Sequence, residues 1–331
     1  MTYQVIGIGN AVMDVIAPVE DDLLARLGIE KGIMQLIERE RAVTLMAAQA
    51  QSNQSARMVA GGSVANTLAG LGMLGLKAAY IGKVADDDIG REYVRQTEAE
   101  GTACVNAPVA GGLPSSRSII FVTPDGERSM NTYLGISAEL NEVDVDPAVF
   151  EGAGWLFLEG YLFDKPAGKA AFLKAAAACH AAGGQAGIAL SDPFCVDRHR
   201  DDFRRLVRDE MDYVIGNVHE WLSLYQVEDL DEALRLAAAD CDTVICTRSG
   251  DDAVLIRRGE RVTAPVHRIV PVDATGAGDQ FAAGLIYGLA TGAPLAVAGR
   301  MGCIAAAEVI SHMGARPLRD VREDFRAEGL I

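Results

Sequence analysis

The stretch VDATGAGDQF, residues 272–281, places three small residues, Gly276, Ala277 and Gly278, directly before the carboxylate of Asp279. An apolar pattern with helical spacing follows, so we expect a helix that begins at this turn. The first N–H groups of a helix lack partners and carry partial positive charge, and small residues let an anion approach them closely. The stretch predicts an anion-binding helix start with an acid beside it. An ordinary loop with an acidic helix cap stays open as the alternative.

The helix predicted after this turn has one apolar stripe, and burial of that stripe would hold the turn rigid. The residues of the stripe are Phe281, Ala282, Leu285, Ile286 and Leu289.

Outward from this stretch, short apolar segments alternate with helical patterns along the whole chain. Buried strands are expected within residues 3–10, 78–82, 154–163, 184–194, 211–221 and 241–250. Helices are expected after Gly62, from a cap at Asp88 to near Gly101, and within 166–184 and 229–240. This alternation predicts an α/β fold with a mostly parallel central sheet and helices on both faces. Ligands in such folds bind beyond the carboxyl ends of the strands.

One segment departs from the alternation. Residues 117–135 contain two runs of β-branched and aromatic residues around the turn PDGE, residues 124–127. This pattern predicts a β-hairpin.

The composition excludes several classes of protein. The 331 residues include 46 acidic and 30 basic side chains, a net charge of −16, and no strongly basic stretch, which argues against nucleic-acid binding. The six cysteines are scattered without a CxxC pair, which favours reduced thiols over zinc or disulfides. No apolar run approaches about 18 residues and the first residues lack a signal-peptide pattern, so we expect a cytoplasmic protein without a membrane segment. A Walker-type GxxxxGK[ST] loop is absent as well.

Three segments together resemble the signatures of the ribokinase/phosphofructokinase-B family of small-molecule kinases. DATGAGDQFAAG, residues 273–284, is similar to the family's DTTGAGD motif, with Ala274 in place of a threonine. AGGSVANTLAGLGMLG, residues 60–75, and GKVADDDIG, residues 82–90, are similar to its two N-terminal signatures. The resemblance covers essentially the whole chain. It implies one ribokinase-like kinase domain over residues 1–331, with lid segments at approximately 15–37 and 105–133 that form a small β lid over the acceptor.

The resemblance also implies roles for the opening stretch. Asp279 would be the catalytic base that takes a proton from an acceptor hydroxyl. The amides of Gly276, Ala277 and Gly278 would stabilise the transferring phosphoryl group.

Two further segments, GNAVMD (residues 9–14) and GGSVAN (residues 61–66), would bind the acceptor. A carboxylate can accept two hydrogen bonds at once, which suits Asp14 for a pair of neighbouring sugar hydroxyls. The full set of expected acceptor residues is Asn10, Asp14, Gly61, Gly62, Ser63, Asn66 and Tyr161.

The nucleotide side is expected at two later strand ends. Asn217 and Glu220 match an N-x-x-E motif that would organise Mg²⁺ and its waters, and Thr247 and Gly250 match a loop that lines the ATP site. A family member would often bind a monovalent cation such as K⁺ behind the anion site. The candidate positions are Asp273, Thr275, Val309, His312 and Gly314.

The acceptor itself is indicated by the segments GNAVMD, SDPF and MNTYLGIS, which look most like those of adenosine-kinase-type members. We expect phosphorylation of adenosine to AMP at the 5′-hydroxyl, with Tyr161, Leu162, Phe163, Met34 and Met130 as candidates for the wall of a base pocket. The alternatives are a kinase for ribose, fructose or a related sugar acid, and a catalytically silent nucleoside-binding protein. The expected partners are small molecules and ATP, and the chain would be a monomer or a homodimer.

Overall fold

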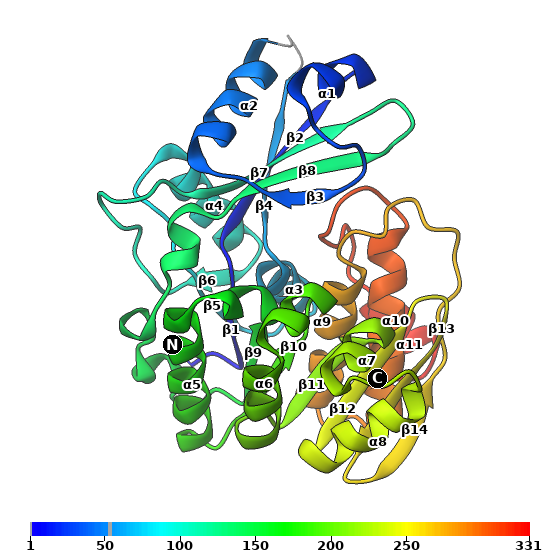
Figure 1. Ribbon diagram of the computed structural model, residues 1–331. Coiled ribbons are helices and arrows are strands. Elements are labelled where there is room, and N and C mark those ends of the chain that lie inside the picture. Colours follow the sequence, from blue (N-terminus) through cyan, green and yellow to red (C-terminus); the bar gives the residue numbers. More distant parts are fainter. Residues whose placement is uncertain (1, 52–54) are drawn as a thin grey trace.

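Two sheets of different size organise the chain in a computed structural model that describes residues 2–51 and 55–331 (Figure 1). The large sheet has nine strands, in the order β14 (Glu260–Ala264), β13 (Asp251–Arg257), β12 (Thr243–Arg248), β11 (Tyr213–Asn217), β10 (Gln185–Ala189), β9 (Trp155–Glu159), β1 (Val5–Ile8), β5 (Ala78–Ile81) and β6 (Thr102–Cys104).

The large sheet is mostly parallel, as the sequence predicts. Every neighbouring pair from β6 to β12 is parallel, whereas β12–β13 and β13–β14 are antiparallel. Only Ser249 and Gly250 separate β12 from β13. A connection this short can make only a hairpin, because a parallel crossover needs a dozen residues or more.

Helices cover both faces of the large sheet and form two separate cores with it. One core contains residues of α5 (Pro166–Ala181), α6 (Pro193–Asp209), α7 (Val218–Tyr225) and α8 (Leu230–Asp240). The other contains residues of α3 (Ser63–Met73), α4 (Asp88–Ala99), α9 (Ala277–Ala290), α10 (Leu295–Ile310) and α11 (Arg322–Ala327). Strand β11 supplies Val214 to the first core and Tyr213 and Ile215 to the second, as the two-residue period of a strand requires.

Short 3₁₀ helices occupy part of the connection on either side of β9. They are η1 (Gly135–Glu139), η2 (Glu142–Asp144), η3 (Pro147–Phe150) and η4 (Gly160–Asp164).

The predicted stripe of α9 is buried, but the helix is buried on its other sides too. Every residue from Gln280 to Leu289 is buried. Helix α9 packs between α3 and α10, so it contacts neighbours all round instead of along one face. The turn in front of it is therefore anchored by a helix that lies inside the protein.

The small sheet has the strand order β3 (Met34–Leu36), β8 (Arg128–Tyr133), β7 (Ser116–Val122), β2 (Val12–Pro18) and β4 (Arg57–Gly61). The hairpin predicted around PDGE is confirmed as the antiparallel pair β7–β8. The segments expected for a lid, approximately 15–37 and 105–133, coincide only partly with this sheet. Strand β4 joins it, and residues 105–115 lie outside it, with Val109 bridging Ala85 instead.

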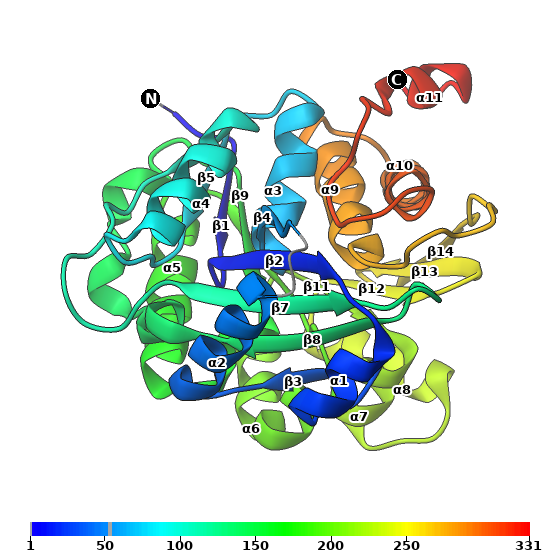
Figure 2. The same ribbon diagram turned by 90° about the horizontal axis from the view of Figure 1, so that it is seen from above.

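Two helices, α1 (Asp21–Leu27) and α2 (Arg39–Gln51), cover one face of the small sheet (Figure 2). Leu24 and Leu45 share a core with Ile119 and Phe121 of β7. On the other face, Ser118 and the β8 residues Met130 and Thr132 point into a cavity between the two sheets. The small sheet therefore has a covered outer face and an inner face that is free to meet a ligand.

Two local predictions are wrong. The N-cap of α4 is Asp87 and not Asp88, because the Asp87 carboxylate accepts hydrogen bonds from the amides of Gly90 (2.7 Å) and Ser115 (2.9 Å). The strand expected over 154–163 ends at Glu159, and residues 160–164 turn back as η4.

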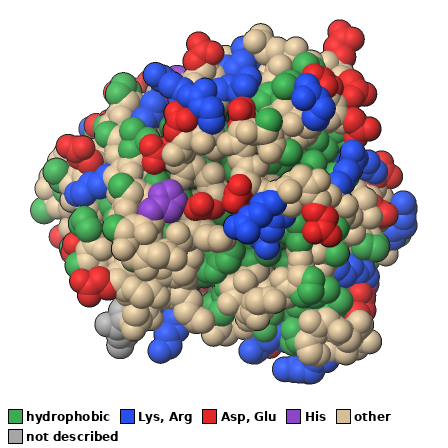
Figure 3. Space-filling view, turned by 90° about the horizontal axis from the view of Figure 1, so that it is seen from below, with side chains coloured by type: hydrophobic (Ala, Val, Ile, Leu, Met, Phe, Trp, Pro, Cys, Tyr) green, Lys and Arg blue, Asp and Glu red, His purple; other side chains and the backbone are tan. Residues whose placement is uncertain are grey.

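The surface carries both signs of charge. On the face shown in Figure 3, acidic and basic side chains are interspersed with apolar ones. Within the described part of the chain, no helix has the length and apolar character needed to cross a membrane.

Candidate active site

The topology of the large sheet brings two chain segments together at its centre. Strands β1 and β9 are parallel neighbours, with β5 beyond β1 on one side and β10 beyond β9 on the other. Such a switch in strand order opens a crevice at the carboxyl ends of the strands. Asn10 follows β1, and Glu159 ends β9. Both line a cavity of about 630 Å³ that lies under the small sheet.

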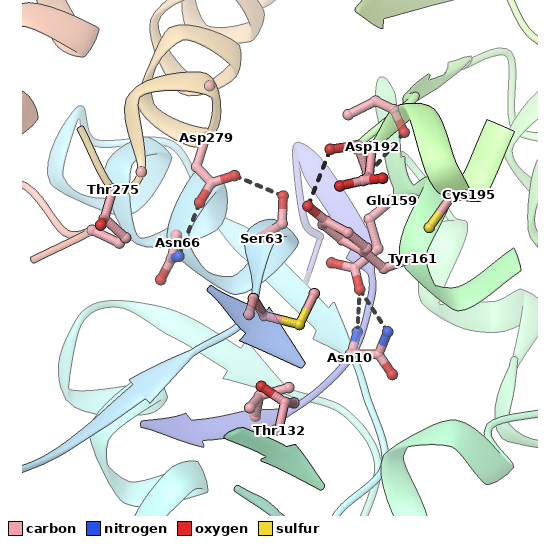
Figure 4. Close-up of a pocket in the computed structure, with 18 of the residues that line it drawn as sticks. Asn10, Ser63, Asn66, Thr132, Glu159, Tyr161, Asp192, Cys195, Thr275 and Asp279 are labelled. Atoms are coloured by element: carbon pink, nitrogen blue, oxygen red, sulfur yellow. Dashed lines mark hydrogen bonds between the residues drawn. The ribbon is translucent and has the colours of Figure 1, made fainter. Parts of the chain in front are cut away.

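Asp279 lies where the N-termini of α9 and α3 meet (Figure 4). The Ser63 hydroxyl donates to Oδ1 of Asp279 (2.6 Å), and the Asn66 amide donates to Oδ2 (2.9 Å). Thr67 donates to the backbone carbonyl of Asp279 (3.1 Å). Burial raises the pKa of Asp279 above its ordinary value, although the bonds from Ser63 and Asn66 act to lower it. The carboxylate is thus fixed in orientation and made more basic than in water.

The turn in front of Asp279 opens into the same cavity. Gly276 is the N-cap of α9 with φ +82°, and no side chain caps this end of the helix. The amide of Ala277 donates to the carbonyl of Ala274 (3.3 Å), so one of the three amides predicted for an anion already has a partner. A Cβ added at Gly278 would meet nothing within 4 Å. The turn therefore combines an uncapped helix start with open space beside it.

Asp14 faces the cavity from the small sheet, on β2. Burial raises the pKa of Asp14 to about 7, although Arg128 and Arg316 act to lower it.

Gly62, at the start of α3, has φ +96°, and a Cβ there would lie 2.2 Å from the Asn10 carbonyl. The backbone can approach Asn10 this closely only at a glycine.

Asn10 is hydrogen-bonded to Glu159 and Ser137. Its backbone and side-chain N–H groups donate to Oε1 of Glu159 (2.8 and 2.9 Å), and its Oδ1 accepts from Ser137 (2.7 Å). The other oxygen of Glu159 accepts from the amide of Val64 in α3 (3.1 Å). Burial raises the pKa of Glu159 to about 7, against the lowering effect of these hydrogen bonds. Sequence reasoning missed Glu159, whose only signal was an acid at the end of a strongly apolar strand.

At the other end of the cavity, Asn217 and Glu220 form a capping box at the start of α7. The backbone amide of Asn217 donates to Oε2 of Glu220 (2.8 Å), and its side chain donates to Oε1 (2.6 Å). Burial raises the pKa of Glu220 to about 7. Thr247 lines the cavity here, whereas Gly250 lies on the β12–β13 turn outside the set of lining residues.

Among the residues expected for a monovalent cation, Asp273 and Thr275 directly precede the turn of residues 276–278. The carboxylate of Asp273 already has partners on both oxygens. Oδ1 of Asp273 accepts from the amide (2.9 Å) and hydroxyl (2.6 Å) of Thr275. Oδ2 accepts from the amide of Gly314 (2.9 Å) and pairs with Arg128 of the small sheet (2.6 Å). Val309 is buried on α10, and His312 lies 3.3 Å from Glu308. Of this set, only Thr275 lines the cavity.

One wall of the cavity is apolar. Met34, Leu36 and Met130 face it from the small sheet. Phe194, 72% exposed at the start of α6, and Tyr161, which donates to the Ser191 carbonyl (3.1 Å), face it from the large one. Leu162 and Phe163, expected in this wall, are buried in the core instead, because η4 turns them away from the cavity.

A buried carboxylate, an open helix start and a partly apolar wall thus share one cavity. The family model for pfkB family carbohydrate kinases matches residues 29–321. The chain belongs to this family. Its members are phosphotransferases with an alcohol group as acceptor, and this chain is such a kinase.

Similar proteins differ in the acceptor that their names give. An adenosine kinase from Sinorhizobium meliloti is 42% identical, with a TM-score of 0.89 over 99% of this chain and 100% of the other. A probable sugar kinase from Rhizobium etli CFN 42 is also 42% identical, with a TM-score of 0.90 over 100% of both chains. Aminoimidazole riboside kinase of Salmonella typhimurium is 30% identical over 69% of this chain and 73% of its own length. The ribokinase-like fold is confirmed, and the acceptor class is a nucleoside or a carbohydrate.

In this kinase, most of the residues predicted from sequence line the one cavity. They are Asn10, Asp14, Gly62, Ser63, Asn66, Tyr161, Asn217, Glu220, Thr247, Thr275, Gly276, Ala277, Gly278 and Asp279. Gly61 lies just outside, beneath Asp14, with a distance of 2.7 Å from its ideal Cβ to the Asp14 carboxylate. Glu159 and Phe194 line the cavity without having been predicted for the site.

The raised pKa of Asp14 predicts how acceptor binding by this kinase depends on pH. Below about pH 7 Asp14 carries a proton and loses acceptor sites for sugar hydroxyls, so the KM for the acceptor is expected to rise as the pH falls through 7. Glu159 and Glu220 titrate in the same range. The KM is measured from pH 5.5 to 8.5 for the wild type and Asp14→Asn. The variant should show a raised KM with little pH dependence, and an unchanged pH dependence would assign the effect to another group.

Proposed function

We propose that this kinase transfers the γ-phosphoryl group of ATP to the 5′-hydroxyl of adenosine or a closely related nucleoside. The observation that carries the proposal is the composition of the cavity. A carboxylate for sugar hydroxyls, Asp14, and an apolar wall large enough for a base lie in the same cavity as Asp279.

Asp279 would act as the base for the acceptor hydroxyl. Its carboxylate is held by Ser63 and Asn66, and its raised pKa favours proton uptake as the hydroxyl oxygen attacks phosphorus. The start of α9 would stabilise the negative charge that spreads over the transferring group, because amides and the helix dipole point at that position. Gly276 and Gly278 would supply the free amides, with that of Ala277 added if its weak bond to Ala274 opens.

Kinases of this family use ATP and Mg²⁺. When bound, Mg²⁺ would neutralise charge on the phosphates. Glu220 and Asn217 fit a role through water, because each Glu220 oxygen already accepts one bond from Asn217 and keeps one further acceptor site. Thr247 would line the nucleotide site, and we extend this role to Gly250 on the neighbouring turn.

A monovalent cation such as K⁺ fits the structure less well. Both oxygens of Asp273 are used by Arg128, Thr275 and Gly314, so we assign no step of the reaction to such an ion. We keep a K⁺ site as a proposal, formed by Thr275 and the backbone at Val309, His312 and Gly314. A comparison of turnover in K⁺ and tetramethylammonium buffers would test it.

The base of the nucleoside would lie between the small sheet and α6. Met34, Leu36 and Met130 contribute flexible apolar side chains on one side, and Phe194 and Tyr161 contribute aromatic rings on the other. An aromatic ring exposed at the mouth of a cavity offers stacking area to a planar base. A simple sugar has no group for this wall. Closure of the small sheet over the acceptor would exclude water from the transferring phosphoryl group.

A sugar acceptor is the second candidate, because the probable sugar kinase from Rhizobium etli is as similar to this chain as the adenosine kinase. Asn10, Asp14 and Asn66 would serve a free sugar as well as a ribosyl group.

We further propose a monomer or a homodimer in the cytoplasm, with a place in purine salvage. The scattered cysteines, which include no CxxC pair, support a reducing compartment.

A substrate panel tests the proposal. The kcat/KM is measured for adenosine, inosine, ribose, fructose and a sugar acid with Mg²⁺ and ATP. Adenosine is expected to exceed ribose and fructose by about 10²-fold or more, because the buried base adds binding energy that a sugar lacks. Phe194→Ala should raise the KM for adenosine and leave turnover of any sugar unchanged. Turnover of a sugar with none of adenosine would reject the nucleoside and support the sugar.

A further inference from the structure

The side chain of Asn66 lies between Asp279 and an arginine from the C-terminal part of the chain. Its Nδ2 donates to Asp279 (2.9 Å), and its Oδ1 accepts from Nε of Arg316 (3.2 Å). Arg316 is not among the residues that line the cavity, and its side chain is only 10% exposed. The hydrogen-bonded link from Arg316 to Asp279 therefore runs through Asn66.

The chemistry of the two partners fixes the orientation of the Asn66 amide. A guanidinium group only donates hydrogen bonds, and an ionised carboxylate only accepts them. With Arg316 on one side and Asp279 on the other, Asn66 can satisfy both only with Oδ1 toward Arg316 and Nδ2 toward Asp279. Ionised Asp279 alone favours this orientation, and Arg316 strengthens the preference, because a flipped amide would also set its NH₂ group against the guanidinium group.

The segment that carries Arg316 also contacts the anion turn. The ideal Cβ position at Gly276 lies 2.6 Å from Cα of Ala315, and Gln280 of α9 donates to the carbonyls of both Ala315 (3.2 Å) and Asn66 (2.8 Å). The guanidinium group of Arg316 forms an ion pair with Glu100 at the end of α4. The backbone beside Arg316 thus packs on the turn of residues 276–278, and its guanidinium group pairs with the end of α4.

We propose that Arg316 is a positioning residue, which keeps the Asn66 amide in the one orientation that supports Asp279 as the base. The proposal rests on the proposed role of Asp279. It differs from a packing role, because it depends on Arg316 being a pure hydrogen-bond donor at Asn66.

Two replacements of similar length separate these roles. Arg316→Lys keeps a donor-only group, whereas Arg316→Gln can also accept a bond and so removes the part of the preference that Arg316 contributes. We expect Arg316→Gln to lower kcat by about tenfold or more with little change in the KM for ATP, and Arg316→Lys to recover much of that loss. The KM for the acceptor should rise in Arg316→Gln, because the charge of Arg316 helps to keep Asp14 ionised. Arg319→Gln is the matched control: Arg319 lies on the same segment, pairs with Asp324 and is exposed, so kcat should not change.

A further variant tests the ion pair, since Arg316→Gln also leaves Glu100 without its partner. Glu100→Gln should keep kcat near the wild-type value, because the Arg316–Asn66 bond is retained. A loss of kcat equal to that of Arg316→Gln would overturn the proposal in favour of the ion pair. Melting temperatures of all variants show whether the fold is kept.

A double-mutant cycle gives the decisive measurement. If Arg316 acts through Asn66, then Arg316→Gln should change kcat less than twofold in an Asn66→Ala background. Independent, multiplicative losses in the double variant would overturn the proposal. Asp279→Asn in the same assay separates failure of the proposed base, Asp279, from failure of the proposed role of Arg316. Full activity of that variant rejects the base itself, whereas its inactivation together with multiplicative losses in the cycle rejects only the role of Arg316.

Discussion

Replacement of Asp279 by asparagine is expected to lower kcat by about 10²- to 10⁴-fold, the contribution typical of a positioned general base. The change is nearly isosteric, and the new amide can keep both neighbours. Its oxygen can accept from Asn66, and its NH₂ group can donate to the hydroxyl of Ser63, which donates to Asp279 in the wild type. Binding of the acceptor, measured by calorimetry, should therefore stay within a few-fold of the wild type while steady-state turnover collapses.

The melting temperature of Asp279→Asn serves as the control for folding. Burial raises the pKa of Asp279, so ionised Asp279 is a cost to the native state that asparagine removes. The variant should consequently be at least as stable as the wild type at pH 8. Wild-type turnover in a folded variant would show that Asp279 is not the base.

Replacement of Gly276 by alanine is expected to lower kcat by about 10²- to 10³-fold, the loss seen when a donor to developing negative charge is removed. Gly276 has φ +82°, and an added Cβ would lie 2.6 to 2.8 Å from backbone and side-chain atoms of Ala315. Relief of this overlap must move the turn or the Ala315 segment packed on it, which displaces the amides that we propose for the transferring phosphoryl group from that segment. The measurements are kcat and the KM for ATP.

Gly292, just after the other end of α9, provides the matched control. It has nearly the same backbone conformation, φ +80°, but a Cβ there would meet nothing within 4 Å. Gly292→Ala should lose only the stability that the left-handed conformation costs an alanine, about 1–2 kcal/mol, and keep its kcat. Equal kcat losses in the two variants would mean that backbone strain, and not the position of the turn, lowers activity.

The features that sequence predicted well are those with a local signal. The turn of residues 276–278, the burial of the α9 stripe and the β7–β8 hairpin follow from spacing and turn chemistry, and all are present. The error at the start of α4 arises because the local signal there is ambiguous. Asp86, Asp87 and Asp88 are three consecutive acids, and only the contact of Asp87 with Ser115, 28 residues away, decides which one caps the helix.

The features that sequence missed depend on contacts between distant segments. Glu159 belongs to the site because β9 lies beside β1, which brings it to Asn10 across 149 residues. Arg316 reaches Asn66 across 250 residues. Leu162 and Phe163 carry the same apolar character as a pocket wall or as core, and only the turn at η4 places them in the core. No spacing rule contains this information.

The most direct test of the account is a crystal structure of the kinase with adenosine and a non-hydrolysable ATP analogue with Mg²⁺. In this crystal the 5′-hydroxyl is expected within about 2.6–3.2 Å of a carboxylate oxygen of Asp279, the reach of a general base. The ribose hydroxyls are expected on Asp14 and the terminal phosphate at the start of α9. Adenosine bound with its 5′-hydroxyl away from Asp279, or a terminal phosphate remote from residues 276–278, would contradict the account.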